Sequence, residues 1–398
     1  MQYLSPGVYV EEVASGARPI EAVGTSTAGF VGVAPNAGAH VHDAKGLDNY
    51  GKFVRMYGAE ESNHLSRAVY GFFQNGGPRC YIVNIGSESE ITGDKKGVKV
   101  LETVDQAAII AAPGLTGAAN WDAILSHCEL MKDRIAILDP PQTADIEMLT
   151  KTAVAPIRKK SGGDDGASDA VGARPRQSDG GYAAYYYPWI YVRDPMSPND
   201  IVATPPSGHL AGIYARTDAM RGVHKAPANE AIRGAINVTY RVTRAEQEIL
   251  NPVGVNCIRF FPREGIRVWG ARTLAPSASD WRYINVRRLF NMIEESIANS
   301  TRWVVFEPND EALWKAITRD VSAFLNLLWR QGAIRGSTPD QAYFVQCDAE
   351  TNPDEVIDAG QVVVRVGIAP VKPAEFVVFR IGQSAAGSSI ETADAGVA

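Results

Sequence analysis

The sequence lacks the short motifs that mark the commonest enzyme families. It contains no G-x-S-x-G, no H-E-x-x-H and no G-x-x-x-x-G-K-[ST], and no G-x-G-x-x-G follows an apolar run that could be a strand. These absences weigh against a serine hydrolase, a zinc peptidase, a P-loop nucleotidase and a dinucleotide-binding enzyme. We therefore expect neither catalysis nor a cofactor.

The sequence also lacks a strong excess of charge and any long apolar run. The 39 Lys and Arg against 45 Asp and Glu give a net charge of −6, which does not favour a nucleic-acid partner. No stretch is long and apolar enough for a membrane span, and no signal sequence begins the chain, so we expect assembly in the cytoplasm without membrane insertion. The four cysteines lie far apart in apolar contexts, as expected of reduced core thiols.

Histidines provide the only candidates for a metal or catalytic site. His40 and His42 lie two residues apart in a loop, but the sequence near them supplies no third and fourth ligand. His209 follows Ser207, a residue that fits better as a helix cap than as a nucleophile. An α/β enzyme with a histidine-rich site is thus a weak alternative.

Apolar strands and amphipathic helices alternate through the first half of the chain. We predict strands within residues 24–33, 80–85, 107–111, 134–138 and 183–192, with helices between them at 65–73 and 121–131. This alternation favours a parallel sheet with helices on both faces. Residues 161–181 are rich in Gly and Asp and have no large apolar side chain, so we predict a flexible surface loop there.

The later part of the chain carries two predicted helices, at 283–298 and 311–331, with a predicted strand at 303–306 between them. Lys315 and Arg319 lie one helical turn apart on the polar face of the longer helix. Most such pairs belong to a solvated face. The alternative is docking to an acidic partner surface.

The two chain ends resemble strands separated from any sheet of their own. In the run 374–381, Phe376 and Val378 point to one face while Val377, Phe379 and Ile381 point to the other, and Arg380 lies between them. Pro370 and Pro373 separate this run from the apolar run 362–368, which makes a tight hairpin awkward.

Near the N-terminus, Val8 and Val10 share one face of a predicted strand, and Tyr9 and Glu11 share the other. Each terminal strand is either an ordinary edge strand of the chain's own sheet or an arm donated to another subunit.

Several stretches together resemble the sheath proteins of contractile phage tails and of phage-tail-like contractile injection systems. The longest are residues 3–12 (YLSPGVYVEE), 68–80 (AVYGFFQNGGPRC), 221–229 (RGVHKAPAN), 265–273 (GIRVWGART), 281–288 (WRYINVRR), 303–310 (WVVFEPND) and 372–380 (KPAEFVVFR). The resemblance extends over nearly the whole chain, whereas residues 161–181 match no part of the family's pattern.

The resemblance implies an α/β sheath fold in four parts. These are an N-terminal strand-exchange arm (1–24), an outer α/β domain (25–264) containing the loop 161–181, a C-terminal inner domain (265–369), and a C-terminal strand-exchange arm and tail (370–398). Arms from neighbouring subunits would complete the sheet of the inner domain. The family's tube-facing helix corresponds to residues 311–331, which would place Lys315 and Arg319 against the tube.

The function implied is that of a structural subunit. Copies of the chain would polymerise as stacked rings around an inner tube, bounded by baseplate and cap proteins, and would contract to drive the tube through a target envelope. The particle would be a phage tail or a contractile injection system. A static strand-exchanged filament is the alternative that the sequence pattern leaves open.

Overall fold

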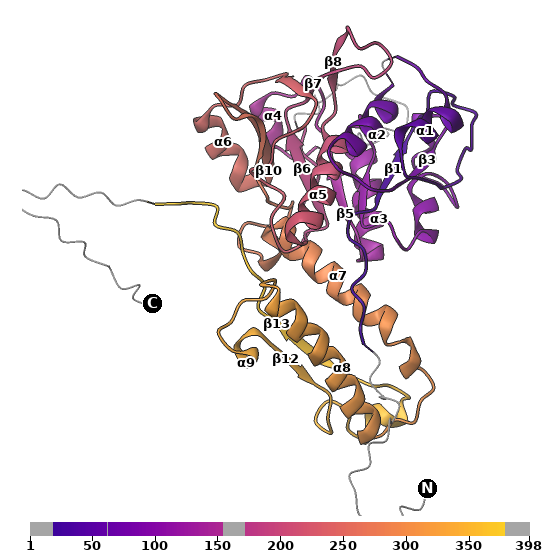
Figure 1. Cartoon of the computed structure of the whole chain (residues 1–398), viewed down its shortest axis with the longest axis vertical. Helices are drawn as coiled ribbons and strands as arrows, with labels where there is room; N and C mark the ends of the chain where they lie inside the picture. Colours follow the sequence, from indigo (N-terminus) through magenta and orange to yellow (C-terminus); the bar gives the residue numbers. More distant parts are fainter. Residues whose placement is uncertain (1–18, 62, 154–171, 379–398) are drawn as a thin grey trace, which may run out of the picture.

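The computed structural model describes residues 19–61, 63–153 and 172–378. Figure 1 shows a large upper body and a smaller lower body, with helix α7 (Ile284–Ser300) running between them. Among the described residues, the junction is crossed by the N-terminal segment along α7, by α7 itself and by the linker that follows strand β13 (Arg365–Ile368).

The upper body is built on an eight-stranded sheet with the order β11-β10-β6-β5-β4-β1-β3-β2. Neighbours from β10 to β3 pair in parallel, and only the edge strands β11 and β2 are antiparallel. The strands are β1 (Ala28–Gly32), β2 (Lys45–Leu47), β3 (Cys80–Asn84), β4 (Ile109–Ala111), β5 (Ile135–Leu138), β6 (Ala183–Tyr187), β10 (Val255–Phe261) and β11 (Gly265–Trp269). The predicted parallel α/β sheet is confirmed.

Both faces of this sheet are buried, which explains why its central strands are apolar throughout. Phe30 of β1 belongs to the core beneath α1 (Tyr50–Tyr57), α2 (His64–Gln74) and α5 (Ser207–Arg221). Its neighbour Val31 belongs to the opposite core, beneath α3 (Ala118–Met131). Successive strand residues point to opposite faces, so a strand between two helical layers needs an apolar residue at each position.

Smaller elements complete the upper body. A three-stranded sheet, β8-β7-β9, lies beside α2, β10 and β11. The elements are α4 (Ile146–Thr150), β7 (Ile190–Arg193), β8 (Ile201–Thr204), β9 (Ala235–Val238), α6 (Arg244–Leu250) and the 3-10 turns η1 (Glu88–Glu90), η2 (Gly97–Thr103), η3 (Asn251–Val253) and η4 (Asp280–Arg282). The prediction of one strand over 183–192 is wrong: the chain divides at Pro188, which has no amide hydrogen for a ladder, and β6 and β7 join different sheets.

The loop predicted at 161–181 is described only from residue 172, since 161–171 lie outside the described residues. From 172 to 181 the chain is an irregular loop, but it does not lie wholly at the surface as predicted. Ala173 and Ser178 are buried, and the Arg174 guanidinium donates to the carbonyl of Val253 at 2.9 Å. Small residues such as these fit beneath the sheet without needing a large apolar side chain.

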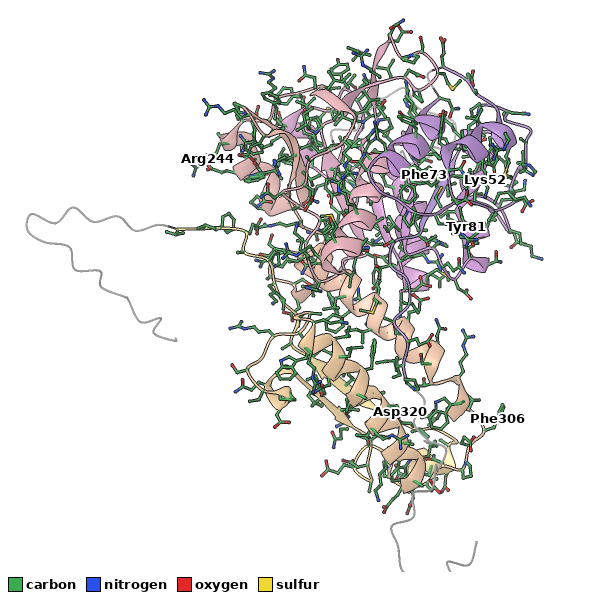
Figure 2. The ribbon with its side chains drawn as sticks, in the orientation of Figure 1. Lys52, Phe73, Tyr81, Arg244, Phe306 and Asp320 are labelled. Carbon is green, nitrogen blue, oxygen red and sulfur yellow. The ribbon has the colours of Figure 1, made fainter. Side chains whose placement is uncertain are left out.

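The lower body has its own core between α7, α8 (Glu311–Arg330) and a two-stranded sheet of β12 (Tyr343–Gln346) and β13. Short elements close it: η5 (Arg302–Val304), α9 (Pro339–Ala342) and α10 (Asp354–Asp358). The strand predicted at 303–306 is wrong. Its first residues form η5, and Phe306, which projects from the lower body in Figure 2, is fully exposed with a φ of 70°, which a β-strand cannot accommodate.

The predicted division of the chain at residue 264/265 falls inside the antiparallel hairpin of β10 and β11. Of the residues that follow this point, the first to enter the separate core of the lower body are Leu289, Met292 and Ile293 of α7. The four-part division therefore stays a prediction, with β11 in the sheet of the upper body.

All four cysteines are buried with free thiols. Burial raises the pKa of Cys257 to about 12 and raises the pKa values of Cys80, Cys128 and Cys347 above their ordinary value. At neutral pH these thiols are protonated and unreactive.

A buried ion pair fastens the junction between the two bodies. Arg288 of α7 and Asp218 of α5, both almost fully buried, form two hydrogen bonds, one of 2.9 Å. The Thr25 hydroxyl donates a hydrogen bond to the Asp218 carboxylate at 2.6 Å, and the Thr25 carbonyl accepts one from Arg288 at 3.0 Å. The Arg288 guanidinium also lies 4.9 Å from the centre of the Tyr214 ring.

We predict that Asp218→Asn destabilises the subunit by about 3–5 kcal/mol, because it leaves the Arg288 guanidinium buried without a counter-charge. Urea denaturation at a protein concentration too low for assembly measures the change. The matched control is Glu248→Gln, which removes the carboxylate of the exposed pair Arg244–Glu248 and should cost less than about 0.5 kcal/mol. Equal effects of the two variants would contradict the role assigned to the buried pair.

Candidate strand-exchange interface

The C-terminal segment leaves the folded bodies with its apolar residues uncovered. Phe376, Val377 and Val378 have exposed fractions of 72, 70 and 77%. Residues 371–378 form no strand within the described chain, and Figure 1 shows the segment extending away from the junction. Three consecutive large apolar residues on a projecting segment are typical of a surface that a partner covers.

The other predicted arm residues lie outside the described residues: Phe379 and Arg380 at the C-terminal end, and Val8, Tyr9, Val10 and Glu11 at the N-terminal end. The described N-terminal segment is held along α7. The amide of Val23 donates to the hydroxyl of Ser296 at 3.0 Å, and that of Glu21 to the hydroxyl of Ser300 at 3.3 Å. Ile20 is buried in the core of the lower body.

Strands β12 and β13 form the most exposed sheet of the described chain. They pair antiparallel, with Tyr343 opposite Ile368 and Gln346 opposite Arg365, and no further strand of the described residues joins them. A two-stranded sheet is marginally stable alone and keeps unpaired amide and carbonyl groups along its edges. The sequence pattern did not predict β12, because its four residues mix aromatic, apolar and polar side chains without a bounding turn motif.

The two faces of this sheet differ. Tyr343, Val345 and Ile368 pack toward the core beneath α8. Phe344, 57% exposed, lies on the other face across from Gly367, where an added Cβ would come 2.0 Å from its ring. The aromatic ring thus covers the backbone of the neighbouring glycine.

Helix α8 presents the predicted cations to solvent. Asp310 caps the helix by accepting from the amide of Leu313 at 2.9 Å, and the apolar residues at helical spacing face the core. Lys315, with a side chain 78% exposed, pairs with Glu311 at 2.9 Å, and Arg319, 52% exposed, pairs with Asp320 at 2.9 Å. The hydrogen bond to Glu311 raises the pKa of Lys315, which therefore stays charged.

The exposed stripe of α8 is longer than the sequence analysis recognised. Ala312, Ala323, Leu327 and Arg330 are exposed on the same side of the helix as Lys315 and Arg319. Their spacing of three and four residues was the available signal. The stripe combines cations with small or apolar side chains, a composition suited to close contact with another protein surface.

The histidine candidates do not come together. His42 lies 3.7 Å from Glu90, and His40 packs edge-on against the ring of Tyr57. Within the described ranges no group of three or more His, Cys, Asp or Glu residues is placed to hold a metal. His209 is buried in α5, where burial lowers its pKa to about 4.

Asp139 is the buried carboxyl nearest to Ser207. It accepts from the amide of Ser207 at 2.9 Å and from its hydroxyl at 2.6 Å, so it fixes the first turn of α5 at the end of β5. Burial raises its pKa to about 6. These hydrogen bonds give the Asp139 carboxylate a structural role at the start of α5.

No described helix is both long enough and apolar enough to cross a membrane.

Comparison with known proteins identifies the family. The model of the phage tail sheath protein central domain matches residues 96–274, and that of the phage tail sheath C-terminal domain matches residues 277–384. The contracted sheath of the extracellular contractile injection system PVC is 30% identical, with a TM-score of 0.75 over 97% of this chain and 99% of that chain. The chain belongs to the phage tail sheath family.

Other relatives support the same family. The contracted helical sheath of the anti-feeding prophage is 31% identical, with a TM-score of 0.72 over 95% of this chain and 99% of that chain. A chain from that particle's baseplate structure is 28% identical, with a TM-score of 0.71 over 96% and 99%. The tail sheath proteins of Vibrio phage KVP40 and Salmonella phage ViI are 27 and 28% identical over 64 and 66% of this chain.

The matched regions span only 37 and 41% of those two phage proteins, so the chain corresponds to less than half of their length. It matches almost the whole length of the PVC and anti-feeding prophage chains. The predicted family and the predicted α/β sheath fold are confirmed.

We predict that Val345→Lys destabilises the lower body by at least about 2 kcal/mol, because it places an ammonium group under α8. Phe344→Lys, one residue earlier, should cost about 1 kcal/mol or less, because that side chain is 57% exposed and covers only the backbone of Gly367. Urea denaturation of unassembled subunits measures both. A larger loss for Phe344→Lys would reverse our assignment of the two faces.

Proposed function

We propose that the chain is the structural subunit of a contractile sheath. Copies polymerise as stacked rings around an inner tube, and the sheath contracts to drive that tube through a target envelope. The observation that carries this proposal is the exposed apolar run 376–378, projecting from a chain whose lower body holds an open two-stranded sheet.

Strand addition links these two features. An arm strand placed against β12 or β13 pairs backbone groups that are otherwise left to water, and each such hydrogen bond contributes about 0.5–1.5 kcal/mol net. Burying the Phe376 and Val378 side chains adds about 1.5–3 kcal/mol for each. Because every subunit repeats the contact, the lattice stays connected while weaker contacts rearrange.

The tube is the proposed partner of α8. Lys315 and Arg319 face solvent on the exposed stripe of α8, where they could contact an acidic tube surface. The end partners proposed for the polymer are a baseplate and a cap. The likeness to a chain of the anti-feeding prophage baseplate structure supports the first of these.

The energy of contraction, in this proposal, is stored in the lattice. An extended arrangement of subunits gives way to a better-packed one, in the manner of a bistable interface, without nucleotide hydrolysis. The chain therefore has no proposed catalytic role. Synthesis and assembly are proposed to take place in the cytoplasm, and the product is a phage tail or a contractile injection particle.

We predict that deleting residues 376–398 abolishes polymers, because it removes the donated strand. A deletion of residues 384–398, which keeps the apolar run and removes only the small-residue tail, should still polymerise. Negative-stain electron microscopy and sedimentation of the purified proteins measure the outcome. Hollow tubes formed by the 376–398 deletion would contradict strand donation by this arm.

We predict that Lys315→Glu combined with Arg319→Glu weakens co-sedimentation with the tube subunit of the same particle by about tenfold or more. Charge reversal turns attraction to an acidic surface into repulsion, and tenfold corresponds to about 1.4 kcal/mol. Self-assembly without the tube should persist. Arg244→Glu, on the far exposed helix α6, is the matched control. If tube binding changed neither with the charge reversal at Lys315 and Arg319 nor with the salt concentration, α8 would be excluded as the surface that contacts the tube.

A further inference from the structure

The carboxylate of Glu375 is held by four hydrogen bonds, directly before the exposed run 376–378. Arg272 binds both oxygens, its Nε to Oε1 at 2.9 Å and its Nη2 to Oε2 at 2.9 Å. The Asn251 amide donates to Oε1 at 2.6 Å, and the Tyr283 hydroxyl donates to Oε2 at 3.1 Å. This is a two-point guanidinium fork with two further donors, one on each oxygen.

The receptor for this carboxylate is part of the folded core. Arg272 is only 8% exposed. Its backbone amide donates to the fully buried Asn256 at 2.7 Å, and its Nη1 donates to the Asn251 carbonyl at 3.1 Å. Arg272 also forms an isolated β-bridge with Tyr283. The guanidinium is thus held in position by its own backbone and by its neighbours.

The pKa of Glu375 is lowered by its hydrogen-bond partners although the side chain is partly buried. Burial alone would raise its pKa, but hydrogen bonds from Arg272 and Asn251, with the charge of Arg272, lower it below its ordinary value. The carboxylate is therefore ionised at neutral pH. Its side chain is 20% exposed, so the pair is screened less by solvent than a surface ion pair is.

The linker before Glu375 crosses from the lower body to the upper one. Pro370 still bridges to Ile334 beside α8. The carbonyl of Val371 then accepts from Asn285 of α7 at 3.0 Å, and Lys372 lies 3.3 Å from Asp280. Glu375 reaches Asn251, at the start of η3, and Arg272, which follows β11, so the last fixed point of the segment lies on the upper body.

We propose that Arg272, Asn251 and Tyr283 form a carboxylate clip that fixes the root of the C-terminal arm to the upper body, so that the arm leaves every subunit in one direction. The inference rests on the proposed donation of this arm. Glu375 is then a positioning residue for strand exchange.

The clip shortens the free part of the arm. Were Glu375 released, the last backbone contact of the segment would be the Val371 carbonyl, and residues 372–375 would add four residues of free chain before Phe376, an extra reach of about 14 Å. A strand that starts from a fixed point samples a smaller volume, so its effective concentration at the neighbouring sheet is higher. The clip also makes the exit point of the arm move with the upper body.

The first test is the critical concentration for polymerisation of the full chain. Glu375→Ala should raise it about tenfold and Glu375→Gln about threefold, because the amide keeps part of the hydrogen bonding without the charge. Glu355→Ala, which removes an exposed carboxylate from α10 in the lower body, is the matched control and should leave it unchanged. An unchanged critical concentration for Glu375→Ala would overturn the clip.

A second test measures the direction of the arm itself. Spin labels attached at Val378→Cys and Ile249→Cys report the distance between the arm and the exposed helix α6. The four native cysteines are buried, so the labels should attach at the two introduced positions. At concentrations below assembly, the intact clip and the Glu355→Ala control should give one narrow distance distribution, and Glu375→Ala a broad one. A residue that only stabilised the fold would shift the melting temperature without widening the distribution, and equal widths would overturn the proposal.

The deletion of residues 376–398 separates this inference from the function on which it rests. If the protein with that deletion still forms tubes, the proposed donation of the arm is wrong, and the clip has no role in strand exchange. If the deletion abolishes tubes while Glu375→Ala assembles as the wild type does, with an equally narrow distance distribution, donation stands and the clip is wrong.

Discussion

The structure depends on the buried ion pair between Arg288 and Asp218. It is the point at which the N-terminal segment, α5 and α7 are fixed to one another, and it lies between two apolar cores that share no sheet. A buried pair of this kind adds modest net stability compared with apolar packing, but it is costly to break. It therefore holds the orientation of the lower body relative to the upper one, and with it the position of the N-terminal segment along α7 relative to Glu375 on the upper body.

The two bodies satisfy their backbone groups to different degrees. The eight-stranded sheet is covered on both faces, and part of its β11 edge is closed by the amides of Asn229 and Ile232, which donate to Val268 and Ile266. The sheet of the lower body has two strands, and the apolar run 376–378 has no strand partner in the described part of the chain. The upper body thus has a sheet covered on both faces, while the lower body has a two-stranded sheet with open edges, and the proposed strand exchange would involve only this small part of the chain.

Much of the fold could be predicted from the sequence because its signals are local. The central strands are short apolar runs between helices, and α8 follows a clear helical spacing. The predictions failed where contacts distant in sequence decide the structure. Residues 303–306 have the composition of a strand but no sheet beside them. Residues 172–181 have the composition of an exposed loop, yet Ala173 and Ser178 are buried. Within the candidate interface, the apolar run near the C-terminus could be predicted from the alternation of its side chains between two faces. The receptor for Glu375 was not, because Asn251, Arg272 and Tyr283 are distant from Glu375 in sequence and carry no shared motif.

The burial and protonation of the four thiols have a consequence for the proposed polymer under oxidising conditions. Disulfide exchange requires a thiolate that can reach its target, and burial denies this chain both conditions. Oxidation would therefore leave the contacts between copies non-covalent. The proposed sheath lattice would then keep the ability to pass from one packing to another under oxidising conditions, whereas a single disulfide between rings would prevent this change.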